Sequence, residues 1–126
     1  MPRVFVIAAL IAAVSGCAHS ARLDEPRTRN NVLTREEIAA APVGNAYEAL
    51  DRLRPNFLRP HATGGRPATA YPVVFIDGVR RGALDVLRSV AANSIVEIRY
   101  LTAADATTRY GLDVQGGVID VKLAGR

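Results

Sequence analysis

The sequence has few of the side chains on which catalytic and metal sites depend. Its 126 residues include a single cysteine, two histidines and no tryptophan. A single cysteine excludes a disulfide framework within the chain, and His61 has no second ligand at the spacing of a metal site. The hydrolase serine elbow, the phosphate-binding loop and the zinc-binding helix motif are also absent. We therefore expect no enzyme, no metal site and no bound cofactor.

Long hydrophobic runs are also scarce. The longest, Val4–Val14, follows Arg3 and has eleven residues, fewer than the roughly 20 that cross a membrane. A charged start and a short apolar core are typical of an export signal. The next segment, Val14-Ser15-Gly16-Cys17, resembles the lipobox of bacterial lipoproteins, in which the cysteine is acylated. The resemblance implies a signal peptide over residues 1–16 and a lipid anchor on Cys17. The alternatives are an ordinary secretory signal and a buried apolar helix.

The lipobox resemblance also implies a location. Ala18 follows the cysteine, in place of the aspartate that retains such proteins in the inner membrane, so we expect the periplasmic face of the outer membrane. Residues 17–31 are rich in charge, with Leu23 as their one large apolar side chain, which predicts a flexible tether. When extended, this tether spans at most about 50 Å. The net charge is +4, but the cations form no stripe with aromatic residues, so we expect no nucleic-acid partner.

Residues 32–126 contain the signals of short helices. Thr34 and Glu37 have the spacing of a capping box and predict a helix ending near Pro42. Asn45 begins a second apolar stripe at helical spacing that continues to about Arg54. Residues 84–90 have weaker helical spacing, and residues 102–110 predict a further short helix that ends at Gly111.

Strands are expected between these helices. Val73–Ile76 is a continuous apolar run, typical of a strand covered on both faces, and Asp77-Gly78 is a tight-turn signal. In residues 95–101 the alternation places Val96, Ile98 and Tyr100 on one face, and in residues 118–123 it turns Asp120 and Lys122 outward. The expected fold class is α+β, with a small mixed sheet of three to four strands and short helices.

Several segments resemble, in this order, the plug domain of TonB-dependent outer-membrane receptors. They are Leu33–Ile38, Ala46–Leu50, Leu53–Pro55, Val73–Val79, Ser94–Ile98, Ala106–Gly111 and Gly116–Val121. The resemblance covers about residues 32–123 and implies a plug-like fold. No barrel segment follows, and no segment resembles the box that contacts TonB, so the blocking of a pore is not carried over.

The resemblance leads to one functional hypothesis and one alternative. We expect a non-enzymatic binding module, anchored by lipid, that recognises an envelope protein; a small-molecule or glycan ligand stays open. The alternative is a structural component that self-associates or docks on a transport or secretion assembly through its exposed sheet edges.

Two groups of residues are candidates for special roles. The loop over residues 59–71 is the candidate binding loop, because arginine and tyrosine are enriched at interface hot spots; a solvated loop without a partner is the alternative. Its residues are Arg59, His61, Arg66 and Tyr71. The second group is expected to form structural turns and contains Asp77, Gly78, Tyr110, Gly111, Gly116 and Gly117.

Overall fold

The computed structural model describes residues 30–62, 70–111 and 113–125. The expected signal peptide, Cys17, most of the expected tether and Arg66 lie outside the described residues. Within the described ranges, no helix has the length and apolar character needed to cross a membrane.

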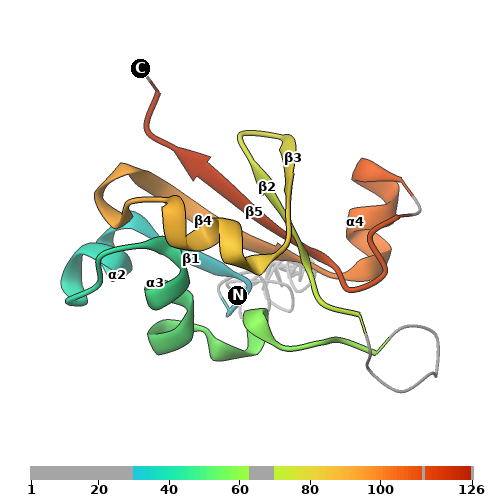
Figure 1. The fold of residues 1–126 in the computed structure, drawn as a ribbon, viewed down its shortest axis with the longest axis horizontal. Helices are drawn as coiled ribbons and strands as arrows, with labels where there is room; N and C mark the ends of the chain where they lie inside the picture. Colours follow the sequence, from blue (N-terminus) through green and yellow to red (C-terminus); the bar gives the residue numbers. More distant parts are fainter. Residues whose placement is uncertain (1–29, 63–69, 112, 126) are drawn as a thin grey trace, which may run out of the picture.

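The domain is an α+β fold with a five-stranded mixed sheet, as the fold class predicted (Figure 1). The strand order is β1-β4-β5-β2-β3, in which β2 and β5 are parallel and the other neighbours are antiparallel. The strands are β1 (Val32–Thr34), β2 (Val73–Ile76), β3 (Val79–Gly82), β4 (Ile95–Leu101) and β5 (Val118–Leu123). The sheet has one strand more than expected, because the residues just before the first helix pair with β4.

Three α-helices and three 3-10 helices connect the strands. They are α2 (Arg35–Ala40), α3 (Ala46–Leu53), α4 (Ala103–Tyr110), η1 (Pro55–Leu58), η2 (Leu84–Ser89) and η3 (Ala92–Ser94). Thr34, Asn45 and Thr102 each accept a hydrogen bond from a backbone amide in the first turn, which confirms the predicted helix starts. The segment with weak helical spacing, residues 84–90, forms a 3-10 helix over Leu84–Ser89 instead of an α-helix.

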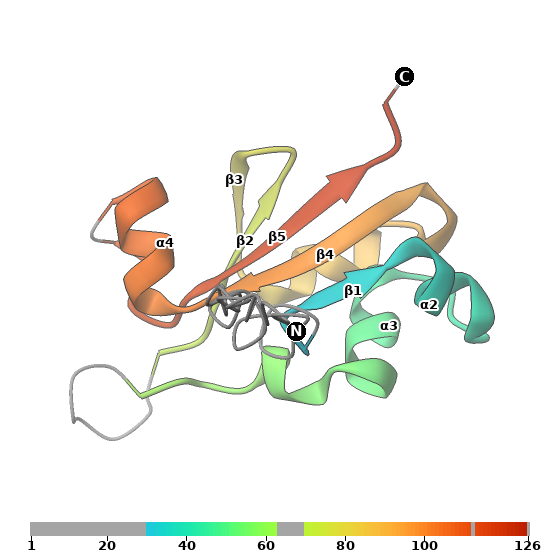
Figure 2. The ribbon, with the colours of Figure 1, turned by 180° about the vertical axis from the view of Figure 1, so that it is seen from behind.

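Helices cover the two faces of the sheet unequally. One face packs against α2, α3 and η2, whereas α4 covers part of the other face (Figure 2). Successive residues of β2 alternate between these sides: Val74 and Ile76 belong to the larger core, and Phe75 to a smaller core beside α4. The prediction that Val73–Ile76 is covered on both faces is therefore confirmed.

The smaller core overturns one prediction about β5. Asp120 was expected to face outward in solvent, but only 5% of its surface is exposed. It lies on the same side of β5 as Val118, which packs against Ala106 of α4 in the smaller core. This side of β5 is therefore buried where Ala106 and Tyr110 of α4 pack on it, which the alternating pattern of a single strand does not reveal.

A β-bulge overturns a prediction about β4. Val96 was expected to share the buried face of Ile98 and Tyr100, yet it is 39% exposed. The pairing of β4 with β5 shifts between Ile95 and Glu97, so one extra residue is inserted there. The insertion allows both Ile95 and Ile98 to enter the larger core although they are three residues apart. Val96 is left on the other face.

Candidate functional site

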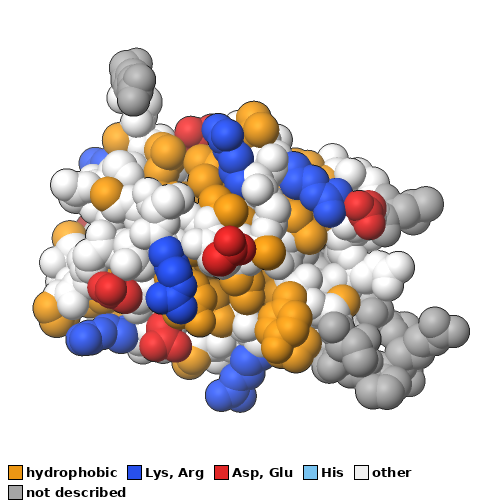
Figure 3. Space-filling model, in the orientation of Figure 1, with side chains coloured by type: hydrophobic (Ala, Val, Ile, Leu, Met, Phe, Trp, Pro, Cys, Tyr) orange, Lys and Arg blue, Asp and Glu red, His pale blue; other side chains and the backbone are white. Residues whose placement is uncertain are grey.

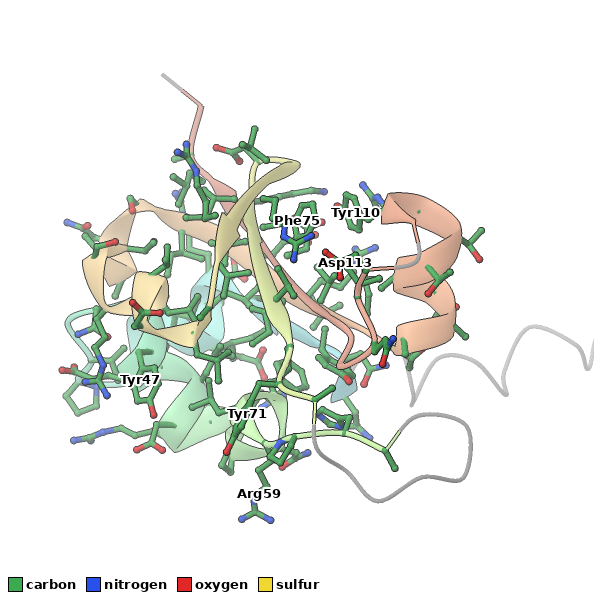
Figure 4. The ribbon with its side chains drawn as sticks, turned by 45° about the vertical axis from the view of Figure 1, so that its right-hand side comes forward. Tyr47, Arg59, Tyr71, Phe75, Tyr110 and Asp113 are labelled. Atoms are coloured by element: carbon green, nitrogen blue, oxygen red, sulfur yellow. The ribbon has the colours of Figure 1, made fainter. Side chains whose placement is uncertain are left out.

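The two ends of the predicted binding loop are joined at its base. The backbone amide of His61 donates to the carbonyl of Ala70 over 3.0 Å, and these residues form an isolated antiparallel bridge. Tyr71 follows directly and is 60% exposed. Its side chain projects toward the same edge of the molecule as that of Arg59 (Figure 4). The structure thus brings three of the four predicted loop residues to one place; Arg66 lies in the part that is not described.

The backbone around Tyr71 is tightly enclosed. Pro72 is fully buried, and a Cβ atom added to Gly116 would lie 2.2 Å from the carbonyl oxygen of Tyr71 and 2.6 Å from that of Ala70. Only glycine fits at this approach. An exposed aromatic side chain is therefore carried on a closely packed section of backbone.

An aromatic stack supports the same loop base from within. The rings of Phe57 and Tyr100 stack with centroids 5.2 Å apart. The His61 ring is tilted against the Tyr100 ring, with centroids 4.7 Å apart. His61 Nε2 is 3.1 Å from the carbonyl oxygen of Asn56. A carbonyl only accepts, so Nε2 carries the proton that is donated. His61 thus anchors the loop base to the sheet.

Tyr100 is held in its neutral form by its surroundings. Its hydroxyl donates to the carbonyl of Gly116 over 3.3 Å, and burial raises the pKa of Tyr100 to about 12. Gly117 has a positive φ of 85°, and a Cβ there would lie 2.6 Å from the Tyr100 hydroxyl. Both glycines of this pair therefore serve the packing of the loop base, as expected for structural turn residues.

The turn between β2 and β3 has a second role in the fold. Asp77 and Gly78 adopt φ values of 49° and 78°, which confirms the predicted tight turn. The Asp77 carboxylate also accepts a hydrogen bond of 3.0 Å from the backbone amide of Leu123, at the end of β5. The turn is thereby attached to the central strand.

Beside α4, three side chains form a connected group. Tyr110 stacks on Phe75 with ring centroids 4.1 Å apart (Figure 4), as the prediction that Tyr110 packs on the sheet required. Its hydroxyl donates to Asp120 Oδ2 over 3.2 Å. Burial, and then the negative charge of Asp120, raise the pKa of Tyr110, so it remains a donor. Gly111 ends α4 with a φ of 96°.

Charged side chains continue across the open part of this face. Glu97 accepts from Arg99 over 3.2 Å and lies 3.3 Å from Lys122 Nζ. Arg99 stands opposite Asp120 in the strand register, yet its guanidinium is turned to Glu97. Among the described residues, Arg99 Nε and Asp120 Oδ1 are buried without a hydrogen-bond partner. Sequence reasoning missed this group because it assigned Asp120 to solvent.

The described parts of the molecule contain no metal cluster, and the face drawn in Figure 3 carries no surface of a single charge. No group of three or more histidine, cysteine or carboxylate side chains suited to a metal occurs in residues 30–62, 70–111 and 113–125. In the view of Figure 3, basic and acidic side chains are mixed, with hydrophobic side chains between them. The surface is thus suited to hydrogen bonding and apolar contact, and has no strong field of one sign on this face.

The chain is similar in fold to a part of a peptide importer. Two solved structures of the RagAB peptide importer, in its "open-open" and "closed-closed" states, each match with a TM-score of 0.51 and 23% sequence identity. Each match covers 74% of this chain and 12% of the importer chain. At this identity the likeness concerns the fold alone, and it supports the plug-like architecture expected from the sequence. No protein-family model and no curated protein matches the sequence.

Proposed function

We propose that this protein is a lipid-anchored, non-enzymatic binding module of the outer membrane, whose plug-like domain recognises another envelope protein. The observation that carries the proposal is Tyr71. A tyrosine with 60% of its surface exposed is carried by backbone that packs against Gly116 and is followed by a buried proline.

The rigidity of this position favours binding. Affinity is reduced by the conformational entropy that mobile side chains and loops lose when they become ordered in a complex. An aromatic group held in place before contact therefore binds with a smaller entropic cost. The His61–Ala70 bridge and the aromatic stack beneath it provide that rigidity. Tyrosine then offers apolar area and a hydroxyl on the same side chain.

Arg59 adds a charge to the same edge. Tyrosine and arginine are the residue types enriched at the centres of protein interfaces, and these two project in the same direction (Figure 4). A partner surface that carries carboxylates around an apolar pocket would match them. The Tyr71–Arg59 edge is thus the surface we assign to the partner.

The expected lipid anchor restricts where that partner is found. A tether of residues 18–31 between Cys17 and the domain reaches at most about 50 Å from the membrane. Tethering raises the effective concentration of a partner fixed in the same membrane and so compensates for a modest interface. An envelope protein at the outer membrane fits both the surface and the tether, and the likeness of fold to a peptide importer is in keeping with it.

Site-specific crosslinking in cells tests the proposal. A photoreactive amino acid at position 71 should capture one envelope protein in high yield, and the Arg59→Ala substitution should lower that yield. The same photoreactive group at Val79, which is 54% exposed in β3, is the matched control and should not capture this protein. Equal capture from positions 71 and 79, or no capture from position 71, would contradict the assignment.

A further inference from the structure

A groove of about 400 Å³ lies between α4, the β2–β3 turn and the open face of the sheet. It shares no residue with the Tyr71–Arg59 edge. Its lining comes from four different elements and consists of Asp77, Gly78, Val96, Arg109, Asp120, Lys122 and Leu123. The volume is in the range of sites for small molecules.

Asp120 gives this groove an unfilled hydrogen-bonding requirement. The residue is 5% exposed, and Tyr110 supplies a donor to only one of its carboxylate oxygens. In the described part of the chain, Oδ1 has no partner. A buried acceptor without a donor is costly, because the group has lost its water and gained nothing in return. Asp120 is one of the residues that line the groove, so a donor bound there lies beside this carboxylate.

The nearest cation does not fill this requirement. Arg99 faces Asp120 across the β4–β5 pair, but its Nη2 donates to Glu97 over 3.2 Å. Lys122 is also drawn to Glu97, at 3.3 Å. Glu97 thus holds the Arg99 guanidinium away from Asp120 and leaves the carboxylate available to a ligand.

The charges around the groove are balanced. Two carboxylates, Asp77 and Asp120, oppose two cations, Arg109 and Lys122. The Arg109 guanidinium lies 5.4 Å from the ring centroid of Tyr110 and forms no ion pair within the described residues. A simple cation would be repelled by Arg109 and Lys122, and a simple anion by the two carboxylates. A ligand that carries both charges meets neither penalty.

We propose that this groove binds the zwitterionic head of a free amino acid. The ligand's ammonium group donates to Asp120. Its carboxylate accepts from Arg109 and from Lys122, whose ammonium has three donors and so keeps two beyond the one directed to Glu97. An apolar side chain on the ligand packs against Val96, which the β-bulge turns to this face. Both charges and the apolar wall are thus matched by one class of molecule.

Titration of the isotope-labelled full chain in detergent micelles with leucine tests the proposal by NMR. Leucine should shift the amide signals of Val96, Arg109 and Lys122 in a saturable manner. Isoamylamine lacks the carboxylate of leucine, and isocaproate lacks its amino group. Each should bind at least about tenfold more weakly, since each loses one set of charge-assisted hydrogen bonds.

The variant Asp120→Asn removes the negative charge while it keeps an oxygen to accept from Tyr110. It should bind leucine at least about tenfold more weakly. Asp113→Asn, in an exposed residue paired with Arg80 outside the groove, is the control and should bind as the parent does. The proposal is overturned if leucine causes no saturable shifts, if Asp120→Asn binds it unchanged, or if isoamylamine binds as well as leucine. These outcomes do not depend on the Tyr71 crosslink, so the two proposals fail separately.

Discussion

Replacement of Gly116 by alanine should destabilise the domain strongly. The added Cβ would lie 2.2 Å from the carbonyl oxygen of Tyr71, 2.5 Å from its carbonyl carbon and 2.6 Å from the carbonyl oxygen of Ala70. All three neighbours are backbone atoms, so no side chain can rotate away. The backbone leading into β2 must then move away from the backbone leading into β5.

The size of the effect follows from the packing. Insertion of one methyl group into a closely packed site costs about 1–3 kcal/mol. We expect a value near the upper end, about 2–3 kcal/mol, because backbone must be displaced. For a domain of this size each kcal/mol lowers Tm by about 4–8 °C, so Tm should fall by roughly 8–24 °C.

Urea and thermal unfolding, followed by circular dichroism, measure this change. The matched control is Gly44→Ala, since a Cβ at Gly44 meets only Glu48 Oε2, at an ordinary contact distance of 3.6 Å. This control should unfold within about 0.5 kcal/mol of the parent. If Gly116→Ala were as stable as Gly44→Ala, the tight approach of the two segments would be refuted.

Four further predictions concern other parts of the fold. Burial raises the pKa of Tyr100 to about 12, above its unfolded value of about 10. The contribution of neutral Tyr100 to the free energy of unfolding is therefore complete below pH 10 and is lost as pH rises toward 12. Tyr100→Phe should reduce this alkaline loss of stability in urea titrations. The pKa of Glu37 is lowered by the hydrogen bond that it accepts from the Thr34 backbone amide and by the Arg54 guanidinium. The free energy of unfolding should therefore fall as pH drops below about 4.5, and Glu37→Gln should reduce that acid dependence. Thr34→Ala should cost about 1 kcal/mol in urea unfolding, because the amide of Glu37 loses its cap. Edge strand β3 carries Arg80 and Arg81 and has a register shift against β2, and both features oppose pairing with the edge of another chain. Light scattering in detergent should therefore give one chain per micelle. A concentration-dependent dimer would favour the self-associating alternative.

Local chemistry made the helices and turns predictable. The capping residues Thr34 and Asn45 act on amides three positions away, and the Asp77-Gly78 turn needs only the positive dihedrals that these residues tolerate. None of these features requires knowledge of distant segments. The corresponding predictions were therefore confirmed to within about a residue.

The candidate groove depends on long-range arrangement and was not predicted. Asp120 is buried because Tyr110 of α4 packs on the same side of β5, and Val96 is exposed because the register shifts at a bulge. The alternation of apolar and polar residues along one strand predicts neither the burial of Asp120 nor the exposure of Val96. The order of β1-β4-β5-β2-β3 likewise depends on pairings between distant segments. The sequence pattern identified the strands but could not assign what covers each face.

The position of β5 has a consequence for the order in which the domain can fold. This strand lies in the middle of the sheet, between β4 and β2, although it is the last strand along the described chain. A chain that emerges with its N-terminus first has only two separate strand pairs until residues 118–123 arrive to join them. Two-stranded units are marginally stable in water. We therefore expect the sheet to become stable only when its central strand has been made.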